Sequence, residues 1–152
     1  MIHYKKAKLF HVQQMQSLVQ PYVSDGTILE RSADEIATNI RSYTLAFDDE
    51  ELIGFSALHI HTVTLAEIRS LIVTHAYQTQ GVGKNLVNLC LDEGASLGLK
   101  EVLVLTYKQA FFEKLEFVEI PKESLPEHKI WADCIKCKHF PLCNEVSLIK
   151  KY

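Results

Sequence analysis

The first part of the chain passes from a β-rich run to hydrophobic residues at helical spacing. Residues 2–6 are expected to form a short strand. Apolar residues then recur every three or four positions, the period of a helix with one buried face. These residues are Leu9, Val12, Met15, Val19 and Tyr22. The turn-forming residues at 24–26 end this helix, which is predicted over about 8–23.

A second helix is indicated by the residues at its start. Ser32 is followed three positions later by Glu35, the offset of a capping box. In such a box the hydroxyl and the carboxylate each bond a backbone N–H of the first turn. Ile36 and Ile40 would be its buried positions, and the helix is predicted to run to about Ser42.

Beyond residue 42 the hydrophobic pattern becomes that of β-structure. Two β-rich runs, 43–47 and 52–61, are separated by the acidic segment 48–51. Two such runs joined by a short polar segment predict a β-hairpin. A third long strand is expected over 66–74.

The second half of the chain alternates between helices and strands. The predicted elements are a helix over 83–97, a buried strand over 101–106, a short helix over 109–115, a strand over 117–120 and a closing strand over 145–150. Gly98 ends the long helix, because glycine readily adopts the left-handed cap conformation. Residues 121–144 read as irregular. The order of elements is typical of a mixed α/β layer fold, expected as a single domain over 1–152.

Composition narrows the class of protein. The chain has 152 residues, of which 47% are hydrophobic and 23% charged, an ordinary globular balance. A formal net charge of −3 argues against non-specific binding of nucleic acid, which requires a basic surface. No apolar run approaches the about 20 residues of a membrane span, and no signal peptide is recognisable. A cytoplasmic protein that binds neither nucleic acid nor membranes is therefore expected.

A glycine loop lies between the predicted strand 66–74 and the predicted helix 83–97. The loop reads Gln78, Thr79, Gln80, Gly81, Val82 and Gly83. A Walker loop is excluded because Gln78 and Asn85 occupy the positions of its first glycine and its hydroxyl residue. A dinucleotide fingerprint is excluded because Leu86 occupies the position of its third glycine. Small residues before a helix N-terminus nevertheless favour an anion, since backbone N–H groups and the helix dipole both point at it.

The loop fits the pattern Gln/Arg-x-x-Gly-x-Gly/Ala, and it resembles the acetyl-CoA-binding motif of the GNAT acyltransferase superfamily. The order of elements extends this resemblance over nearly the whole chain. Residues 111–117 resemble the family's short helix and the turn that follows it, although Glu116 replaces the usual glycine of the turn. The resemblance implies a central mixed, mostly antiparallel sheet flanked by helices, with acetyl-CoA as co-substrate. The cofactor-binding residues that it implies are Leu71, Ile72, Val73, Gln78, Thr79, Gln80, Gly81, Val82, Gly83, Lys84 and Asn85.

The same resemblance suggests residues for acyl transfer. Glu67 stands where many members of the superfamily place the base that accepts the amine proton. The alternative is a strand glutamate paired with Arg69, two positions along on the same face. Backbone N–H groups near 71–73 would stabilise the oxyanion. The family often uses a tyrosine as general acid where this chain has Phe112, so Tyr107 is the alternative, beside solvent or a purely packing role for that tyrosine.

Three further residues invite a chemical interpretation. Cys90 lies on the apolar stripe of the long helix and is expected to fill the core. His59 and His61 alternate onto one face of a strand. They could line an acceptor site, although a surface or core position would account for them as well.

Three passages resemble the acetyltransferase domain of bacterial N-acetylglutamate synthases, especially the short stand-alone forms. They are residues 26–32, residues 105–115 and the segment around Trp131 that runs to Glu145. The resemblance implies N-acetylation of L-glutamate in arginine biosynthesis, with a homodimer as a family-level expectation. Another amino acid, a small amine or a non-catalytic acyl-CoA-binding module remains an alternative.

A glutamate acceptor needs cations for its two carboxylates, ideally the planar fork of arginine. Arg31 matches the arginine that this branch places before the second helix. Arg69 on the central strand and Lys108 after the buried strand are the other substrate-binding candidates. Arg31 and Lys108 could instead be solvated surface charges, and Arg69 could be the partner of Glu67.

Cys134, Cys137 and Cys143 form a cluster with three potential thiolate ligands. A structural zinc site usually has four ligands, and His128 or His139 could supply the fourth. A redox-sensitive dithiol and reduced cysteines that order a proline-rich loop are the alternatives. The cysteine cluster therefore predicts bound zinc only as a secondary possibility.

Overall fold

The computed structural model describes residues 1–26, 28–121 and 145–152. Its centre is a seven-stranded sheet in the order β1-β2-β3-β4-β5-β7-β6. The strands are β1 (Ile2–Lys6), β2 (Tyr43–Asp48), β3 (Glu51–Ile60), β4 (Leu65–Val73), β5 (Glu101–Thr106), β6 (Val118–Ile120) and β7 (Val146–Lys151). Neighbouring strands are antiparallel except β4 and β5, which are parallel. The predicted mixed, mostly antiparallel sheet is confirmed.

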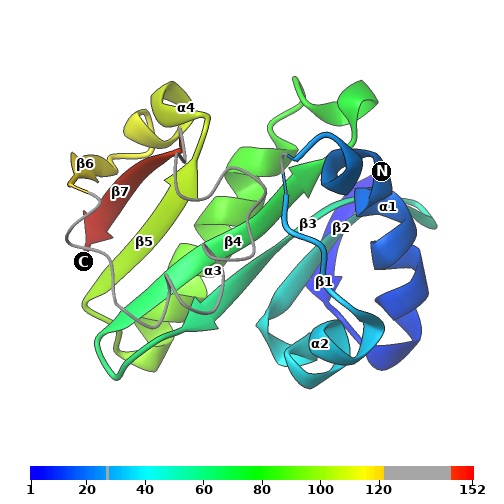
Figure 1. The fold of residues 1–152 in the computed structure, drawn as a ribbon, viewed down its shortest axis with the longest axis horizontal. Coiled ribbons are helices and arrows are strands. Elements are labelled where there is room, and N and C mark those ends of the chain that lie inside the picture. Colours follow the sequence, from blue (N-terminus) through cyan, green and yellow to red (C-terminus); the bar gives the residue numbers. More distant parts are fainter. Residues whose placement is uncertain (27, 122–144) are drawn as a thin grey trace.

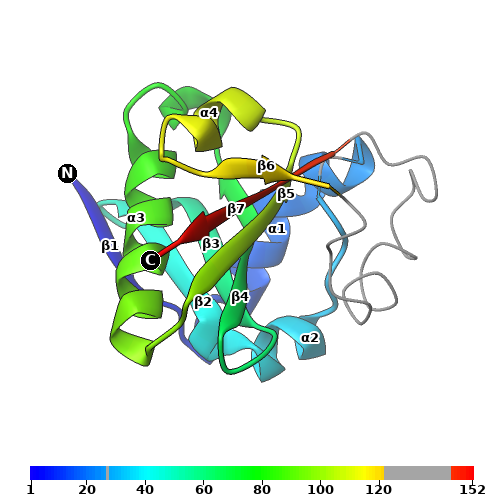
Figure 2. The same ribbon diagram turned by 90° about the vertical axis from the view of Figure 1, so that its left-hand side faces the viewer.

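Helices cover both faces of this sheet (Figures 1 and 2). They are α1 (Val12–Ser24), α2 (Ala33–Thr38), α3 (Val82–Leu97) and α4 (Gln109–Glu113), with 3-10 turns at Leu9–His11, Ile40–Ser42 and His75–Tyr77. Figure 2 shows α3 on one side of the sheet and α1 and α2 on the other. None of the helices in the described ranges is long and apolar enough to cross a membrane.

Each face of the sheet carries its own hydrophobic core, as strand alternation requires. On the α3 side, Ile68 of β4 packs with Val87 and Cys90 of α3. On the other side, Leu45 of β2 packs with Met15 of α1. Cys90 is fully buried, so the expectation that it fills the core is confirmed.

The capping box at α2 forms, but the helix is shorter than predicted. The Glu35 N–H donates to Ser32 Oγ at 3.1 Å, and the Ser32 N–H donates to Glu35 Oε1 at 3.3 Å. The helix ends at Thr38, because the Asn39 backbone leaves the helical region and its side-chain amide bonds the Glu35 carbonyl at 2.9 Å. Ile40 therefore lies in a following 3-10 turn and is only half-buried.

Two local irregularities shape the centre of the sheet. The register of β3 against β4 shifts between Phe55 and Ala57, which accommodates an extra residue in β4. Ser70 lies there with a φ of 58°, the left-handed value found in some β-bulges. Within the described part of the chain, β4 pairs with β5 only through Leu65–Glu67. Beyond Glu67 the two strands diverge, as Figure 1 shows.

The turn after α4 forms even though glutamate replaces the usual glycine. Glu116 adopts a φ of 72°, and the Phe117 N–H returns to the Phe112 carbonyl at 3.1 Å. Lys150 Nζ donates to Glu116 Oε2 and to the Leu115 carbonyl, both at 3.1 Å. These bonds hold a glutamate in a conformation that glycine adopts without strain.

Candidate functional site

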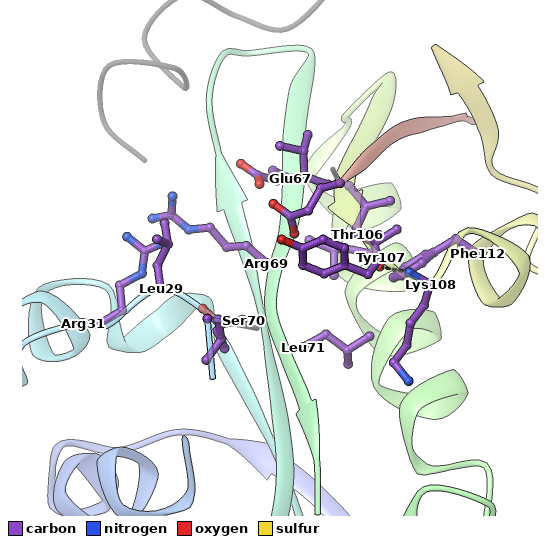
Figure 3. Close-up of a pocket in the computed structure, with 16 residues that line it drawn as sticks. Leu29, Arg31, Glu67, Arg69, Ser70, Leu71, Thr106, Tyr107, Lys108 and Phe112 are labelled. Atoms are coloured by element: carbon purple, nitrogen blue, oxygen red, sulfur yellow. Dashed lines mark hydrogen bonds between the residues drawn. The ribbon is translucent and has the colours of Figure 1, made fainter. Parts of the chain in front are cut away.

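A pocket opens where β4 and β5 diverge, with a cavity volume of about 170 Å³. Its walls come from the segment before α2, from β4, from the end of β5 and from the start of α4 (Figure 3). It is lined by the predicted catalytic residues Glu67 and Tyr107 and by the predicted substrate-binding residues Arg31, Arg69 and Lys108. The structure thus brings together five residues from three segments that are distant in the sequence.

Strand geometry explains how Glu67 reaches this pocket. Glu67 lies opposite His59 of β3, and Arg69 lies opposite Ala57, which packs in the core on the α1 side. Because alternate residues share a face, both charged side chains leave the sheet on that side. Ile68, between them, points into the opposite core. Glu67 is 1% exposed and lies in the wall of the cavity.

A partner of Glu67 is His61, which the sequence did not single out as such. His61 Nε2 lies 2.8 Å from Glu67 Oε1, and both side chains are 2% exposed. The His59 ring stands edge-on to the His61 ring, with centroids 4.9 Å apart. His59, His61 and Glu67 stand at even offsets from one another in the sequence. That spacing indicates a shared face only when the turn joining β3 to β4 is known.

The two arginines bring positive charge to one wall. The Arg31 side chain is 14% exposed, and its Nη1 lies 3.8 Å from Glu35 Oε2. Figure 3 shows Arg31 and Arg69 extending into the same part of the pocket from different elements. Burial raises the pKa of the nearby Tyr43 hydroxyl, while the positive charges of Arg31 and Arg69 act to lower it. Both guanidinium groups therefore act on one small region, which would suit an anionic group.

The opposite wall carries Tyr107 and Lys108. Tyr107 is 44% exposed, and Figure 3 shows its ring over the centre of the pocket. Lys108 is exposed, and its side chain is directed away from the two arginines. Phe112, at the position where the family often has a tyrosine, is 2% exposed and packs edge-on against Phe117. Glu145 adds a second carboxylate to the lining.

The glycine loop leads directly into the N-terminus of α3. Gly81 is the cap residue with a φ of 79°, and its carbonyl accepts the first helical bond from the Asn85 N–H at 3.0 Å. The N–H groups of Val82, Gly83 and Lys84 precede that bond and have no helical acceptor. Gly81, Lys84 and Asn85 are exposed, so the positive end of the helix faces solvent.

Several side chains of the loop brace it from within. Gln78 Nε2 donates to the Val73 carbonyl at 3.0 Å, and Gln80 Nε2 donates to the Ala76 carbonyl at 3.5 Å. Asn85 Nδ2 donates to the Tyr4 hydroxyl at 3.0 Å. Thr79 is exposed. The side chains of Gln78 and Asn85 thus hold the loop in place, and their backbone N–H groups bond the His75 and Gly81 carbonyls.

The segment 71–73 connects the pocket to the loop. Leu71 lines the pocket, whereas Ile72 and Val73 are buried in separate hydrophobic cores. Because β5 has diverged from this part of β4, the backbone groups of 71–73 on that side have no strand partner among the described residues. Any ligand contact from Ile72 and Val73 would therefore come from their backbone.

The cysteine cluster lies outside the described residues, together with most of the passage around Trp131. Within the described ranges, no group of three or more histidine, cysteine or carboxylate side chains could hold a metal ion. Zinc binding by Cys134, Cys137 and Cys143 therefore stays a prediction from sequence.

Comparison with known proteins identifies related sequences over most of the chain. Residues 12–117 match the model of the acetyltransferase (GNAT) family. An uncharacterized N-acetyltransferase of Chlorobaculum tepidum is 34% identical over 146 residues, which cover 96% of this chain and 94% of that protein. An amino-acid acetyltransferase of Mycobacterium tuberculosis is 28% identical over 119 residues, covering 76% of this chain and 68% of that protein.

A solved structure shares the fold over nearly the whole chain. It is the N-acetylglutamate synthase of Neisseria gonorrhoeae complexed with coenzyme A and N-acetyl-glutamate, with a TM-score of 0.87 and 21% sequence identity. The match covers 99% of this chain and 35% of that protein. At this level of identity the likeness is one of fold.

Proposed function

The chain belongs to the acetyltransferase (GNAT) family, and from that premise we propose that it transfers an acetyl group from acetyl-CoA to the α-amino group of L-glutamate. One observation carries the proposal: a buried carboxylate and two arginines from different segments line one pocket, and the strand that bears the carboxylate leads through the glycine loop to the N-terminus of α3. The carboxylate suits an amine, and the arginines suit carboxylates.

The loop before α3 would hold the phosphates of acetyl-CoA. The N–H groups of Val82, Gly83 and Lys84 and the helix dipole favour a pyrophosphate. Lys84 adds a positive charge in the first turn of the helix. The diverging edge of β4 would receive the rest of the molecule, which brings the thioester next to Glu67.

The acceptor would be bound by charge. Arg31 and Arg69 would each match a carboxylate of L-glutamate, and Glu67 would face its ammonium group. Glutamine or lysine would leave one of the two guanidinium groups without a carboxylate partner, and loss of such a partner in a partly buried site is costly. Glu145 could accept a second ammonium, so a cationic amine acceptor is the second candidate.

The residues of the chain would divide the chemistry between them. When bound, acetyl-CoA supplies an acetyl group activated as a thioester. Glu67 removes a proton from the acceptor ammonium, directly or through water, so that a neutral amine can attack. Backbone N–H groups at 71–73 stabilise the negative charge that develops on the acetyl oxygen. Tyr107 or solvent returns a proton to the departing thiolate. The product would be N-acetyl-L-glutamate, a precursor for arginine biosynthesis.

Arginine replacement tests the assignment of the acceptor site. Arg31→Ala is expected to raise KM for L-glutamate about 10- to 100-fold, since a hydrogen bond to a charged group is worth about 1.5–3 kcal/mol. KM for acetyl-CoA should stay near the wild-type value. Arg41→Ala is the matched control, because Arg41 is exposed and lies outside the pocket lining. A larger rise in KM for acetyl-CoA than for L-glutamate would dismiss the assignment.

A further inference from the structure

Glu67 and His61 form a buried pair in the wall of the pocket. The imidazole Nε2 and a carboxylate oxygen are 2.8 Å apart, and both side chains are 2% exposed. Only Glu67 of the two lines the cavity. His61 therefore stands behind Glu67 as seen from the space that an acceptor would occupy.

The position of the pair follows from the turn between β3 and β4. His61 comes directly after β3, and its backbone N–H donates to the Leu65 carbonyl at 2.9 Å. Thr62 Oγ1 accepts from the Leu65 N–H at 3.0 Å, so the turn is tied by both hydrogen bonds. This tight connection places a histidine six residues before the glutamate within reach of it.

A carboxylate that removes a proton must present an oxygen to the acceptor amine in a fixed direction. Glu67 is 1% exposed, so bulk water does little to orient it. The neighbouring imidazole has a nitrogen 2.8 Å from one carboxylate oxygen, and an N–H donated from there fixes the direction of the carboxylate.

Other charged and titratable groups surround the pair. His59 of β3 stands edge-on to His61, and Arg69 of β4 shares the face of Glu67. Arg31, Tyr107 and Glu145 also line the pocket. The pair therefore lies in a wall whose other charged groups have both signs.

We propose that His61 is a positioning residue for Glu67, whose Nε2–H donates to one carboxylate oxygen and so orients the carboxylate toward the acceptor amine. The inference rests on the proposed acetyl transfer. The ammonium gives a proton to the Glu67 carboxylate, and the carboxylic acid gives it to water in the pocket. The amine lone pair then forms the bond to the acetyl carbon, and the thiolate leaves with the electrons of the broken C–S bond. The nitrogen gives up its second proton to water, and water or Tyr107 protonates the thiolate.

Two substitutions of His61 test the orienting hydrogen bond. His61→Gln keeps an amide N–H close to the position of Nε2 that can donate to the carboxylate, whereas His61→Ala removes the donor. His61→Ala should lower kcat about 10-fold or more, because a misplaced catalytic group can cost about 100-fold, with KM for both substrates within about two-fold of wild type. His61→Gln should keep kcat near the wild-type value. Equal losses of kcat in the two variants, or wild-type kcat in His61→Ala, would overturn the assignment.

A matched control accounts for the loss of a buried histidine as such. His11 is 4% exposed and packs beside Phe47 in the core on the α1 side, and its Nδ1 accepts the Lys8 N–H at 2.9 Å. Asparagine can accept that same bond, so His11→Asn should leave kcat unchanged. A kcat loss in His11→Asn equal to that in His61→Ala would overturn the assignment, because any buried histidine would then have the same effect.

A measurement without turnover separates this inference from the proposed function. The ¹⁵N NMR signals of the His61 ring should shift in Glu67→Gln, and its Nε2 proton should exchange faster with solvent than in the wild type. Unchanged ring signals and exchange would overturn the pairing in solution. Absence of wild-type turnover on every amine would instead refute the proposed acetyl transfer, while the NMR result would still report on the pair.

Discussion

Replacing Gly81 or Gly83 with alanine separates two roles of glycine in the loop before α3: a left-handed backbone conformation and the absence of a Cβ. Gly81 has a φ of 79°, and a Cβ built there meets no other atom within 4 Å. At Gly83, a Cβ would lie 3.5 Å from Phe111 Cζ and 3.8 Å from Val73 Cγ2, which are ordinary contacts. Alanine is therefore strained at Gly81 by the backbone alone and is accommodated at Gly83.

The expected free energies of unfolding have opposite signs. A left-handed conformation costs alanine about 1–2 kcal/mol, partly offset by about 0.4–1 kcal/mol of lost freedom in the unfolded chain. Gly81→Ala should thus lower stability by about 1 kcal/mol, or about 2–4 °C in Tm for a domain of this size. Gly83→Ala should raise stability by up to about 1 kcal/mol, since Gly83 lies inside a helix.

Urea unfolding followed by circular dichroism measures the stabilities, and titration calorimetry measures the Kd for acetyl-CoA. The added methyl of Gly81→Ala would stand in open space beside the cap of α3, where the proposed pyrophosphate site lies. We expect its Kd to rise about 10-fold, equivalent to about 1.4 kcal/mol, and the Kd of Gly83→Ala to change less. An unchanged Kd in Gly81→Ala would refute the loop as the phosphate site. Equal destabilisation by both variants would refute the backbone argument.

Three other predictions follow from single side chains. Glu116→Gly should stabilise the protein by up to about 0.5 kcal/mol in urea unfolding. The relieved left-handed strain exceeds the sum of the freedom that glycine adds to the unfolded chain and the loss of an exposed ion pair with Lys150. A loss of stability would show that these two costs dominate. Burial raises the pKa of the Cys90 thiol to about 11, so Cys90 should resist iodoacetamide at pH 8 in the folded protein and react in urea, as read by peptide mass spectrometry. Because the pKa of the Cys90 thiol is raised in the folded protein, the stability that this thiol contributes is present below about pH 9 and is lost as the pH rises through about 11. Rapid alkylation under native conditions would contradict the burial of Cys90. Glu67→Gln should lower kcat about 100-fold or more with little change in KM for acetyl-CoA, and an unchanged rate would remove Glu67 as the base.

The elements could be predicted from sequence because their signals are local. The capping pair Ser32 and Glu35, the glycine at 98 and the hydrophobic periods are all contained within a few residues. The shared face of Glu67 and Arg69 was equally predictable, since it depends only on strand alternation. The family resemblance carried by the loop before α3 is also confirmed.

Other features depend on contacts that the sequence does not express. The pairing of His61 with Glu67 requires the register of β3 against β4 and the turn between them. Ser70 and Glu116 adopt positive φ values, which neither serine nor glutamate signals. The early end of α2 had a signal in Asn39, whose side chain competes with the helix for a backbone carbonyl.

Specificity for the acceptor amine tests the central claim most directly. Purified protein is incubated with acetyl-CoA and L-glutamate, L-aspartate, L-glutamine, L-lysine or a polyamine, and the release of free thiol gives kcat/KM for each amine. The account predicts the highest kcat/KM for L-glutamate, at least about 10-fold above L-glutamine, since loss of one charged hydrogen-bond partner is worth about 1.5–3 kcal/mol. Mass spectrometry should identify the product as N-acetyl-L-glutamate. Equal or higher kcat/KM for L-glutamine, L-lysine or the polyamine would contradict it.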